Sequence, residues 1–274
     1  MSAILTAVIP VVIIGIICAA MLVIASKLMA VKEDERLPKV RECLPGANCG
    51  ACGYAGCDGY AKALVEDEGV PTNLCVPGAD GVAKQLSEVL GVEFEDVVEQ
   101  VAVIQCSGDC DHTEDIVDYK GIESCSAAKL LYGGKGKCGY GCLGLGDCAA
   151  VCPQDAICIE KGLAHINQRL CIGCGLCAKT CPNSLISIIP DVERVVIACS
   201  NRDKGAATRK ACSSGCIGCR KCVKVCPNGA ISIVDNLAVI DYSKCENCPD
   251  FGVCARECTV KCIQLKDLSG IHRF

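Results

Sequence analysis

The chain has 274 residues, of which 29 are cysteine and none is tryptophan, and its net charge is −5. Cysteine at about one residue in nine is typical of a covalent or metal scaffold that replaces a large hydrophobic core, so a self-sufficient α/β enzyme core is not expected. The acidic balance argues against nucleic acid as a general partner, because that binding usually needs a basic surface.

An uncharged apolar run occupies residues 3–25 near the amino end of the chain. It is long enough to cross about 30 Å of hydrocarbon as a helix. A cleaved signal peptide is the alternative, but no basic residue precedes the run and no small-residue cleavage site separates it from the charged stretch that follows. We therefore expect residues 1–28 to be a single transmembrane anchor.

Basic residues follow this run, at Lys27, Lys32, Arg36, Lys39 and Arg41. The positive-inside rule then predicts a single-pass protein of the cell membrane with the rest of the chain on the cytoplasmic side. Disulfides do not persist in a reducing compartment, so the cysteines are expected to hold metal, either zinc or iron–sulfur clusters.

Two segments have the spacing C-x2-C-x2-C-x3-C-P, which is that of bacterial ferredoxins. They run from Cys171 to Pro182 and from Cys216 to Pro227. Zinc ribbons use separated C-x2-C pairs, which disfavours a zinc-bearing structural adaptor. Three thiolates on one tight loop instead predict a [4Fe-4S] cluster, with the fourth cysteine ligating the neighbouring cluster.

Two further segments are variants of the same unit. One contains Cys142, Cys148 and Cys152, with Leu145 in the place of the second cysteine; the other contains Cys245, Cys248, Cys254 and Cys258, with Thr259 in the place of the proline. Each variant lies 29 residues from a full motif, Cys142 before Cys171 and Cys245 after Cys216. We therefore predict two tandem 2[4Fe-4S] ferredoxin-like modules, over residues 133–190 and 211–274, joined by a connecting strand and loop over residues 191–210.

Crossed ligation assigns the cysteines of these modules to clusters. The expected sets are Cys216, Cys219, Cys222 and Cys258; Cys226, Cys245, Cys248 and Cys254; and Cys152, Cys171, Cys174 and Cys177. The remaining set has only Cys142, Cys148 and Cys181, and Cys138 is the nearest replacement for its fourth ligand. A three-iron cluster at this position is the alternative.

Another four-thiolate set precedes the modules, at Cys49, Cys52, Cys57 and Cys75. Glycines between these cysteines allow the loop backbone to approach inorganic sulfide. A short helix from Asp58 to Glu68 is expected to return the chain toward Cys75, and the apolar face of residues 82–90 predicts a second helix that covers this domain. We place this small α-rich 4Fe-4S domain at residues 29–95.

The connecting region, residues 96–132, contains cysteines outside any motif. The segment from Val101 to Cys106 is similar to that from Val195 to Cys199, so a strand that ends in cysteine is expected before each module. We predict a sixth cluster on Cys106, Cys110 and Cys125, with a fourth ligand from Cys138, Cys199 or Cys212. Reduced thiols in a loop are the alternative. Four cysteines are expected to hold no cluster: Cys18, Cys43, Cys158 and Cys262.

These motifs, with the sequence LPGANCGACGYAGCDGYAKAL and the apolar run before it, resemble the B subunits of Rnf membrane electron-transport complexes over essentially the whole chain. Two ferredoxin-like modules make the chain similar to the longer, polyferredoxin-like members. The resemblance implies an α+β chain with a transmembrane helix and about six [4Fe-4S] clusters. It also implies soluble ferredoxin as electron donor, and integral-membrane and flavin-bearing Rnf subunits as partners.

No P-loop, HExxH, nucleophile elbow or dinucleotide-binding motif stands in a supporting context, so no catalytic site beyond electron transfer is expected. We expect the chain to be the electron-transfer subunit of an ion-translocating ferredoxin oxidoreductase, pumping Na⁺ or H⁺. A polyferredoxin wire of another membrane redox complex, such as a hydrogenase, is the alternative. Seven basic residues against one acid between Arg202 and Lys224 form either a docking face for acidic ferredoxin or a solvated loop.

Overall fold

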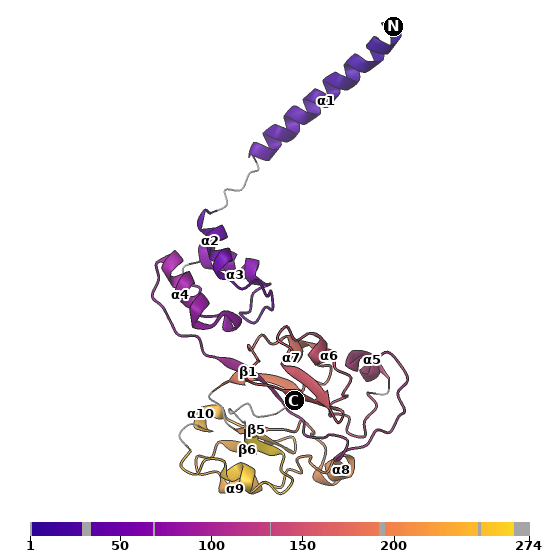
Figure 1. Cartoon of the computed structure of the whole chain (residues 1–274), viewed down its shortest axis with the longest axis vertical. Helices are drawn as coiled ribbons and strands as arrows, with labels where there is room; N and C mark the ends of the chain where they lie inside the picture. Colours follow the sequence, from indigo (N-terminus) through magenta and orange to yellow (C-terminus); the bar gives the residue numbers. More distant parts are fainter. Residues whose placement is uncertain are drawn as a thin grey trace.

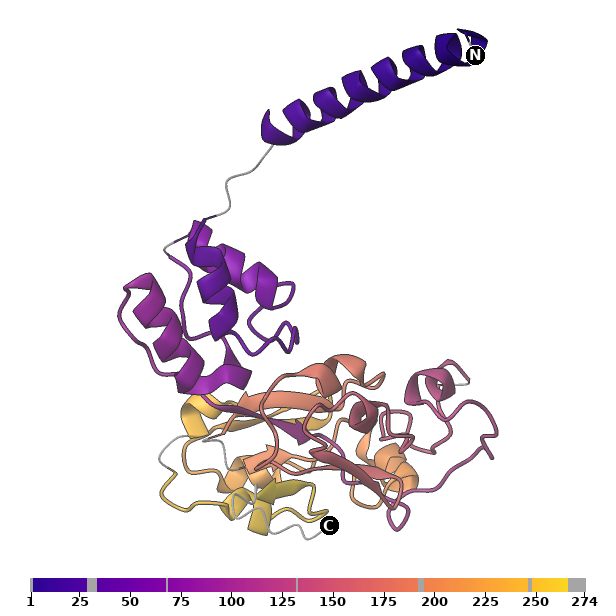
Figure 2. The same ribbon diagram turned by 45° about the horizontal axis from the view of Figure 1, so that its top comes forward.

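The computed structural model describes residues 2–28, 34–67, 69–131, 133–191, 195–245 and 248–265. Helix α1 (Ser2–Leu28) stands apart from the other elements in Figures 1 and 2. Side chains in α1 are described at Ile9 and residues 12–25, and these are exposed. Among the described residues, no helix has both the length and the apolar character that a membrane crossing requires. The predicted transmembrane helix is therefore not confirmed.

A small helical unit follows α1. Its elements are α2 (Arg36–Cys43), α3 (Cys57–Glu66), the 3-10 turn η1 (Val76–Gly78) and α4 (Ala79–Leu90). The Asn48 side chain accepts a hydrogen bond from the Cys57 amide at 2.9 Å, where α3 begins. Tyr60 and Leu86 are fully buried between the helices. The prediction of a helix that covers this unit is confirmed, since α4 contributes Leu86 to the shared core.

The next part of the chain, with the first ferredoxin-like module, contains two antiparallel strand pairs and short helices. Its elements are β1 (Gln100–Ile104), α5 (Cys125–Leu130), α6 (Asp147–Ala150), β2 (Ile157–Glu160), β3 (Leu163–Ile166), α7 (Leu176–Thr180) and β4 (Ile186–Pro190). Strand β2 pairs with β3 as a hairpin, and β1 pairs with β4. Cysteines and apolar residues together form the core of this part, as expected for a core built around thiolate ligands.

The part with the second module repeats this arrangement. Its elements are β5 (Val195–Ile197), α8 (Gly205–Ala211), α9 (Lys221–Val225), β6 (Ile231–Val234), β7 (Leu237–Ile240), α10 (Tyr242–Cys245), α11 (Val253–Arg256) and β8 (Ile263–Leu265). Strand β6 pairs with β7, and β5 pairs with β8. The chain thus mixes helices and strands, in agreement with the α+β class predicted from the sequence.

The strands expected before each module form, and each joins the last strand of its own module. Their ends are equivalent: the Gln105 amide donates to the Leu185 carbonyl at 2.7 Å, and the Ala198 amide donates to the Cys262 carbonyl at 2.7 Å. Because both strands leave the sheets in the same way, Cys106 and Cys199 begin equivalent loops.

A reciprocal pair of hydrogen bonds joins these two loops. The Ser107 hydroxyl donates to the Ala198 carbonyl at 3.0 Å, and the Ser200 hydroxyl donates to the Gln105 carbonyl at 3.0 Å. The two modules therefore meet around a local twofold-like arrangement. Figures 1 and 2 show the two modules side by side, with the helical unit α2–α4 next to the first.

Candidate iron–sulfur centres

Site 1 lies in the helical unit and consists of Cys49, Cys52, Cys57 and Cys75. Burial raises the pKa of Cys75, and the neighbouring thiols of the other three raise it further. Cys57 begins α3 and Cys75 precedes η1, so packing of α3 and α4 fixes two members while the glycine-rich loop carries the others. The structure therefore brings together the four cysteines that the sequence grouped here.

Site 2 consists of Cys152, Cys171, Cys174 and Cys177, which line one small cavity. Cys177 lies on α7, and burial raises its pKa to about 11, with Cys171, Cys174 and Cys152 adding to the rise. Cys152 comes from the other cysteine segment of the module. The crossed grouping expected from the ferredoxin spacing is thus present in the structure.

Site 3 differs from the sequence-based grouping. Its small cavity is lined by Cys142, Cys148 and Cys181 together with Cys125, where the sequence analysis placed Cys138. Cys125 begins α5, and the Asp147 carboxylate on α6 accepts hydrogen bonds from its amide at 2.9 Å and from the Ser124 hydroxyl at 3.0 Å. This carboxylate therefore fixes α5 against α6 and turns Cys125 toward the other three thiols.

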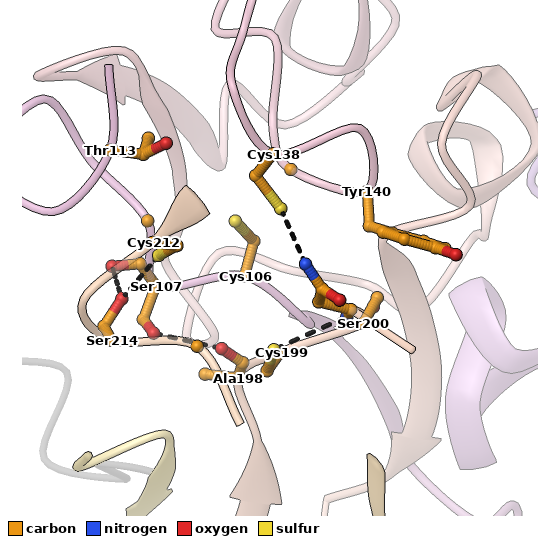
Figure 3. Close-up of a pocket in the computed structure, with 14 residues that line it drawn as sticks. Cys106, Ser107, Thr113, Cys138, Tyr140, Ala198, Cys199, Ser200, Cys212 and Ser214 are labelled. Carbon is orange, nitrogen blue, oxygen red and sulfur yellow. Dashed lines mark hydrogen bonds between the residues drawn. The ribbon is translucent and has the colours of Figure 1, made fainter. Parts of the chain in front are cut away.

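Site 4 lies between the modules and also differs from the expected grouping. Its small cavity is lined by four cysteines, and Figure 3 shows their sulfur atoms around one space: Cys106, Cys138, Cys199 and Cys212. Cys110 and Cys125, which were grouped with Cys106, do not line this cavity.

Polar groups next to site 4 hold its sulfur atoms in place. The buried Asn201 side chain donates to the Cys138 sulfur at 3.4 Å, and the Cys216 amide donates to the Cys199 sulfur at 3.2 Å. Burial raises the pKa of Cys106 to about 12, while amide hydrogen bonds, including one from Cys142, oppose the rise. At neutral pH these thiols keep their protons unless a positive charge such as iron compensates for burial.

Site 5, in the second module, consists of Cys216, Cys219, Cys222 and Cys258. Burial raises the pKa of Cys222 to about 11, and the thiols of Cys216, Cys219 and Cys258 add to the rise. Cys262, expected to be a packing residue, is buried at 1% exposure with its sulfur 3.7 Å from that of Cys258. The structure therefore places a fifth thiol beside this set.

Site 6 contains Cys226, Cys248 and Cys254. Burial raises the pKa of Cys254, and the Cys226 and Cys248 thiols raise it further. Cys245, the expected fourth member, ends helix α10. As in site 2, one cysteine comes from the neighbouring motif of its module.

A repeated amide contact marks the cysteines that cross between motifs. Cys152, Cys181 and Cys226 each accept a hydrogen bond from the amide four residues further on, at 3.3, 3.4 and 3.3 Å. Such donors stabilise negative charge on sulfur, which favours the thiolate form that a metal requires. The prolines at 153, 182 and 227, directly after these cysteines, lack an amide donor.

The donor sets fit iron–sulfur cubes. Sites 2, 3 and 4 are small cavities, each lined by four cysteines. Four thiolates around one cavity are the ligand set of a [4Fe-4S] cluster. In the described part of the chain, no group of three or more His, Cys, Asp and Glu side chains is placed to hold one metal ion.

Five cysteines lie outside the six sites: Cys18, Cys43, Cys110, Cys158 and Cys262. The Cys43 thiol donates to the Lys39 carbonyl at 3.3 Å, and the Cys158 thiol to Glu160 at 3.9 Å. Cys110 is exposed. Apart from Cys110, these are the residues that the sequence analysis set aside.

Cys199 and Cys212 are the members of site 4 that sequence reasoning left as alternatives. A signal for them was available, because Cys106 corresponds to Cys199 and Cys138 to Cys212. A site between two similar modules that meet in a twofold-like way is expected to take an equivalent pair of cysteines from each module. Cys110 and Cys125 have no counterpart in the second half of the chain.

Together, the fold and these sites define a ferredoxin-type iron–sulfur protein with several cluster sites. Family models agree: residues 44–77 match an Fe-S cluster family and residues 170–231 match the family of 4Fe-4S dicluster domains. The second match covers the two full cysteine motifs, although the structure places them in different modules.

Curated relatives identify the family. The chain is 44% identical over 253 residues to the B subunit of the proton-translocating ferredoxin:NAD(+) oxidoreductase complex of Clostridium ljungdahlii, covering 92% of this chain and 89% of that protein. It is 40% identical to the B subunit of the Na(+)-translocating ferredoxin:NAD(+) oxidoreductase complex of Acetobacterium woodii (91% and 74% covered). It is also 40% identical to the B subunit of the ion-translocating oxidoreductase complex of Methanosarcina acetivorans (92% and 94% covered). The chain therefore belongs to the B subunits of Rnf-type ion-translocating oxidoreductase complexes, and the predicted resemblance is confirmed.

Proposed function

We propose that this chain carries electrons from reduced ferredoxin, through six [4Fe-4S] clusters, to partner subunits of a membrane-bound Rnf-type complex that translocates Na⁺ or H⁺. The relatives support this role, since two of them are named as subunits of ion-translocating ferredoxin:NAD(+) oxidoreductases. The iron–sulfur clusters would supply the electron-transfer chemistry, and the chain would set their positions and surroundings.

Sites 1 to 6 supply the ligands in this proposal, with Cys245 as the fourth ligand of site 6. They use 24 of the 29 cysteines, which leaves the five named above. Burial favours the protonated form of the thiols, so loading of the sites releases protons. Amide donors at Cys152, Cys181, Cys199 and Cys226 then help to hold the negative charge on sulfur.

The observation that carries the proposal is that each site lies next to another site, so that the sites follow one another in a series. Sites 1 and 2 adjoin each other at Cys49 and Cys174. Burial raises the pKa of Cys174, and the nearby Cys49 thiol raises it further. Sites 2 and 3 exchange Cys152 and Cys181 between the two cysteine segments of the first module. Such contiguity is what electron transfer in single steps between clusters requires.

Site 4 joins the two modules in the same manner. The Cys142 backbone lies near Cys106 and lowers the pKa of its thiol, and the Cys216 amide of site 5 donates to the Cys199 sulfur at 3.2 Å. Site 4 therefore adjoins site 3 on one side and site 5 on the other. Sites 5 and 6 continue the series, since Cys226 and Cys258 cross between their motifs, and in this proposal electrons pass from site to site along the series.

We also propose that α1 anchors the chain in the membrane, with the cluster sites on the cytoplasmic side. Support comes from the relatives, which are named as subunits of ion-translocating complexes, and from the sequence. The run from residue 3 to residue 25 carries no charge, and Ile9 and residues 12–25 are exposed.

The decisive experiment is to measure iron and acid-labile sulfide in the full chain after purification without oxygen. Six cubes predict about 24 iron atoms per chain. Titration with reduced ferredoxin is then expected to reduce the chain stepwise. Zinc in place of iron, or an iron-loaded chain that dithionite reduces and ferredoxin does not, would contradict the proposal. Purification with hydrogenase subunits only would assign the chain to a different membrane complex.

A further inference from the structure

The two full cysteine motifs are nearly identical in sequence but differ in their surroundings. Within the motif, Cys174 corresponds to Cys219 and Lys179 corresponds to Lys224. Both lysines follow the third cysteine by two residues, on α7 and on α9. Because α7 and α9 occupy equivalent positions in the two motifs, the exposure of the two motif surfaces can be compared directly.

The face of the first motif is covered by another part of the same chain. The Lys179 ammonium donates to the Cys49 carbonyl at 2.9 Å and to the Gly50 carbonyl at 3.4 Å. Cys174 is 8% exposed and lies beside the Cys49 thiol. A cluster loop thus docks on this face, with a lysine binding its backbone carbonyls.

The equivalent face of the second motif is bare. Cys219 is exposed, and all 29 cysteines are among the described residues, so it is the one exposed thiol in sites 1 to 6. Lys224 is also exposed and forms no ion pair with the described residues. The counterpart of the Cys49 loop is absent from this surface in the described part of the chain.

Arg220, next to Cys219, has an unusual backbone conformation for a non-glycine residue. It precedes α9 in the left-handed region with φ +61°. The equivalent positions before α6, α7 and α11 have similar values and are all glycine: Gly146, Gly175 and Gly252. An arginine here costs conformational free energy that glycine avoids, and such outliers gather at functional positions.

Positive charge also distinguishes this face. Arg220 and Lys224 are exposed, and Lys221 between them pairs with Glu257 at 2.8 Å. In the first motif the positions of Arg220 and Lys221 are held by Gly175 and Leu176, both uncharged. The bare face therefore carries more positive charge than the covered one and attracts an acidic partner.

We propose that the surface from Cys219 to Lys224 docks a soluble, acidic ferredoxin, whose cluster loop contacts Lys224 as the Cys49 loop contacts Lys179. This inference rests on the proposed function and specifies where the donor binds. Reduced ferredoxin would give up one electron and become oxidised, and the cluster at site 5 would accept that electron and become reduced.

Equilibrium binding of an oxidised bacterial-type 2[4Fe-4S] ferredoxin tests the surface without electron transfer. With the cluster-loaded full chain, R220E/K224E is expected to weaken binding about tenfold or more at low ionic strength, and to flatten its salt dependence. The matched control is K84E, which reverses an exposed lysine on α4 and is expected to bind like the wild type. Carbodiimide cross-linking to ferredoxin is expected to map to Lys224.

A second variant, R220G, restores the glycine of the other three motifs. It is expected to keep or raise thermal stability while it weakens ferredoxin binding. Equal binding by wild type, R220E/K224E and R220G would overturn the docking surface and leave the proposed function intact, provided that ferredoxin still reduces the chain. If ferredoxin neither binds nor reduces the wild type while dithionite does, ferredoxin as donor fails as well.

Discussion

Cys125 lines site 3 although it lies outside the cysteine motifs, 17 residues before Cys142. Substitution by serine is expected to remove a thiolate from a four-thiolate set. We expect C125S to lose about four iron atoms per chain, or to leave a three-iron centre in site 3. Iron analysis and electron paramagnetic resonance of the purified chain measure this change.

The matched control is C110S, which removes an exposed thiol from the same region of the sequence. Its iron content is expected to equal that of the wild type, because Cys110 lines none of the three four-cysteine cavities described above. Iron loss in C110S as well as in C125S would support the grouping expected from the sequence, in which both residues are ligands with Cys106, and would contradict the one seen in the structure.

Among the structural elements, α7 links the helical unit to the first module. Replacement of Lys179 by methionine removes the two hydrogen bonds to the loop of site 1, at Cys49 and Gly50. Since each hydrogen bond contributes roughly 1 kcal/mol, and the longer one less, we expect amide hydrogen exchange in residues 49–53 to rise about five- to thirtyfold. Exchange measured by mass spectrometry reports this local change, with K84M as the control.

If K179M left exchange in that loop at the wild-type rate, the contact between site 1 and site 2 would not depend on this lysine. Exchange in β1 and β4 is expected to stay unchanged in either case, because their pairing lies in the body of the first module. The comparison therefore separates loosening of the loop from general destabilisation.

The repeat made some of these elements predictable and others not. Cysteine spacing is local, so it predicted the groupings of sites 1, 2, 5 and 6, while the similarity between residues 101–106 and residues 195–199 predicted the strands before each module. The fourth thiol of site 3 depends on Asp147 fixing α5 against α6, a contact between residues 22 positions apart that spacing does not encode. Site 4 depends on how two modules pack, and only the correspondence of Cys106 with Cys199 pointed to it.

At the scale of the whole molecule, α1 and the cluster-bearing units are separate parts of the structure. Deletion of residues 2–28 is expected to move the chain from the membrane fraction to the soluble fraction. Its iron content is expected to stay the same, because Cys18, the one cysteine removed, belongs to none of the six sites. Fractionation followed by iron analysis tests both expectations, and retention in the membrane would contradict the proposed anchor.

Site 4 lies between the two modules, so two modules together provide more sites than twice the number in one module. One ferredoxin unit offers two centres, but a second copy adds three, because the extra one takes two cysteines from each half: Cys106 and Cys138 from the first, Cys199 and Cys212 from the second. Neither half holds a complete ligand set for it, so a chain with a single module could not form this site. If a cluster at site 4 carries electrons between the modules, separation of the two halves is expected to interrupt electron transfer.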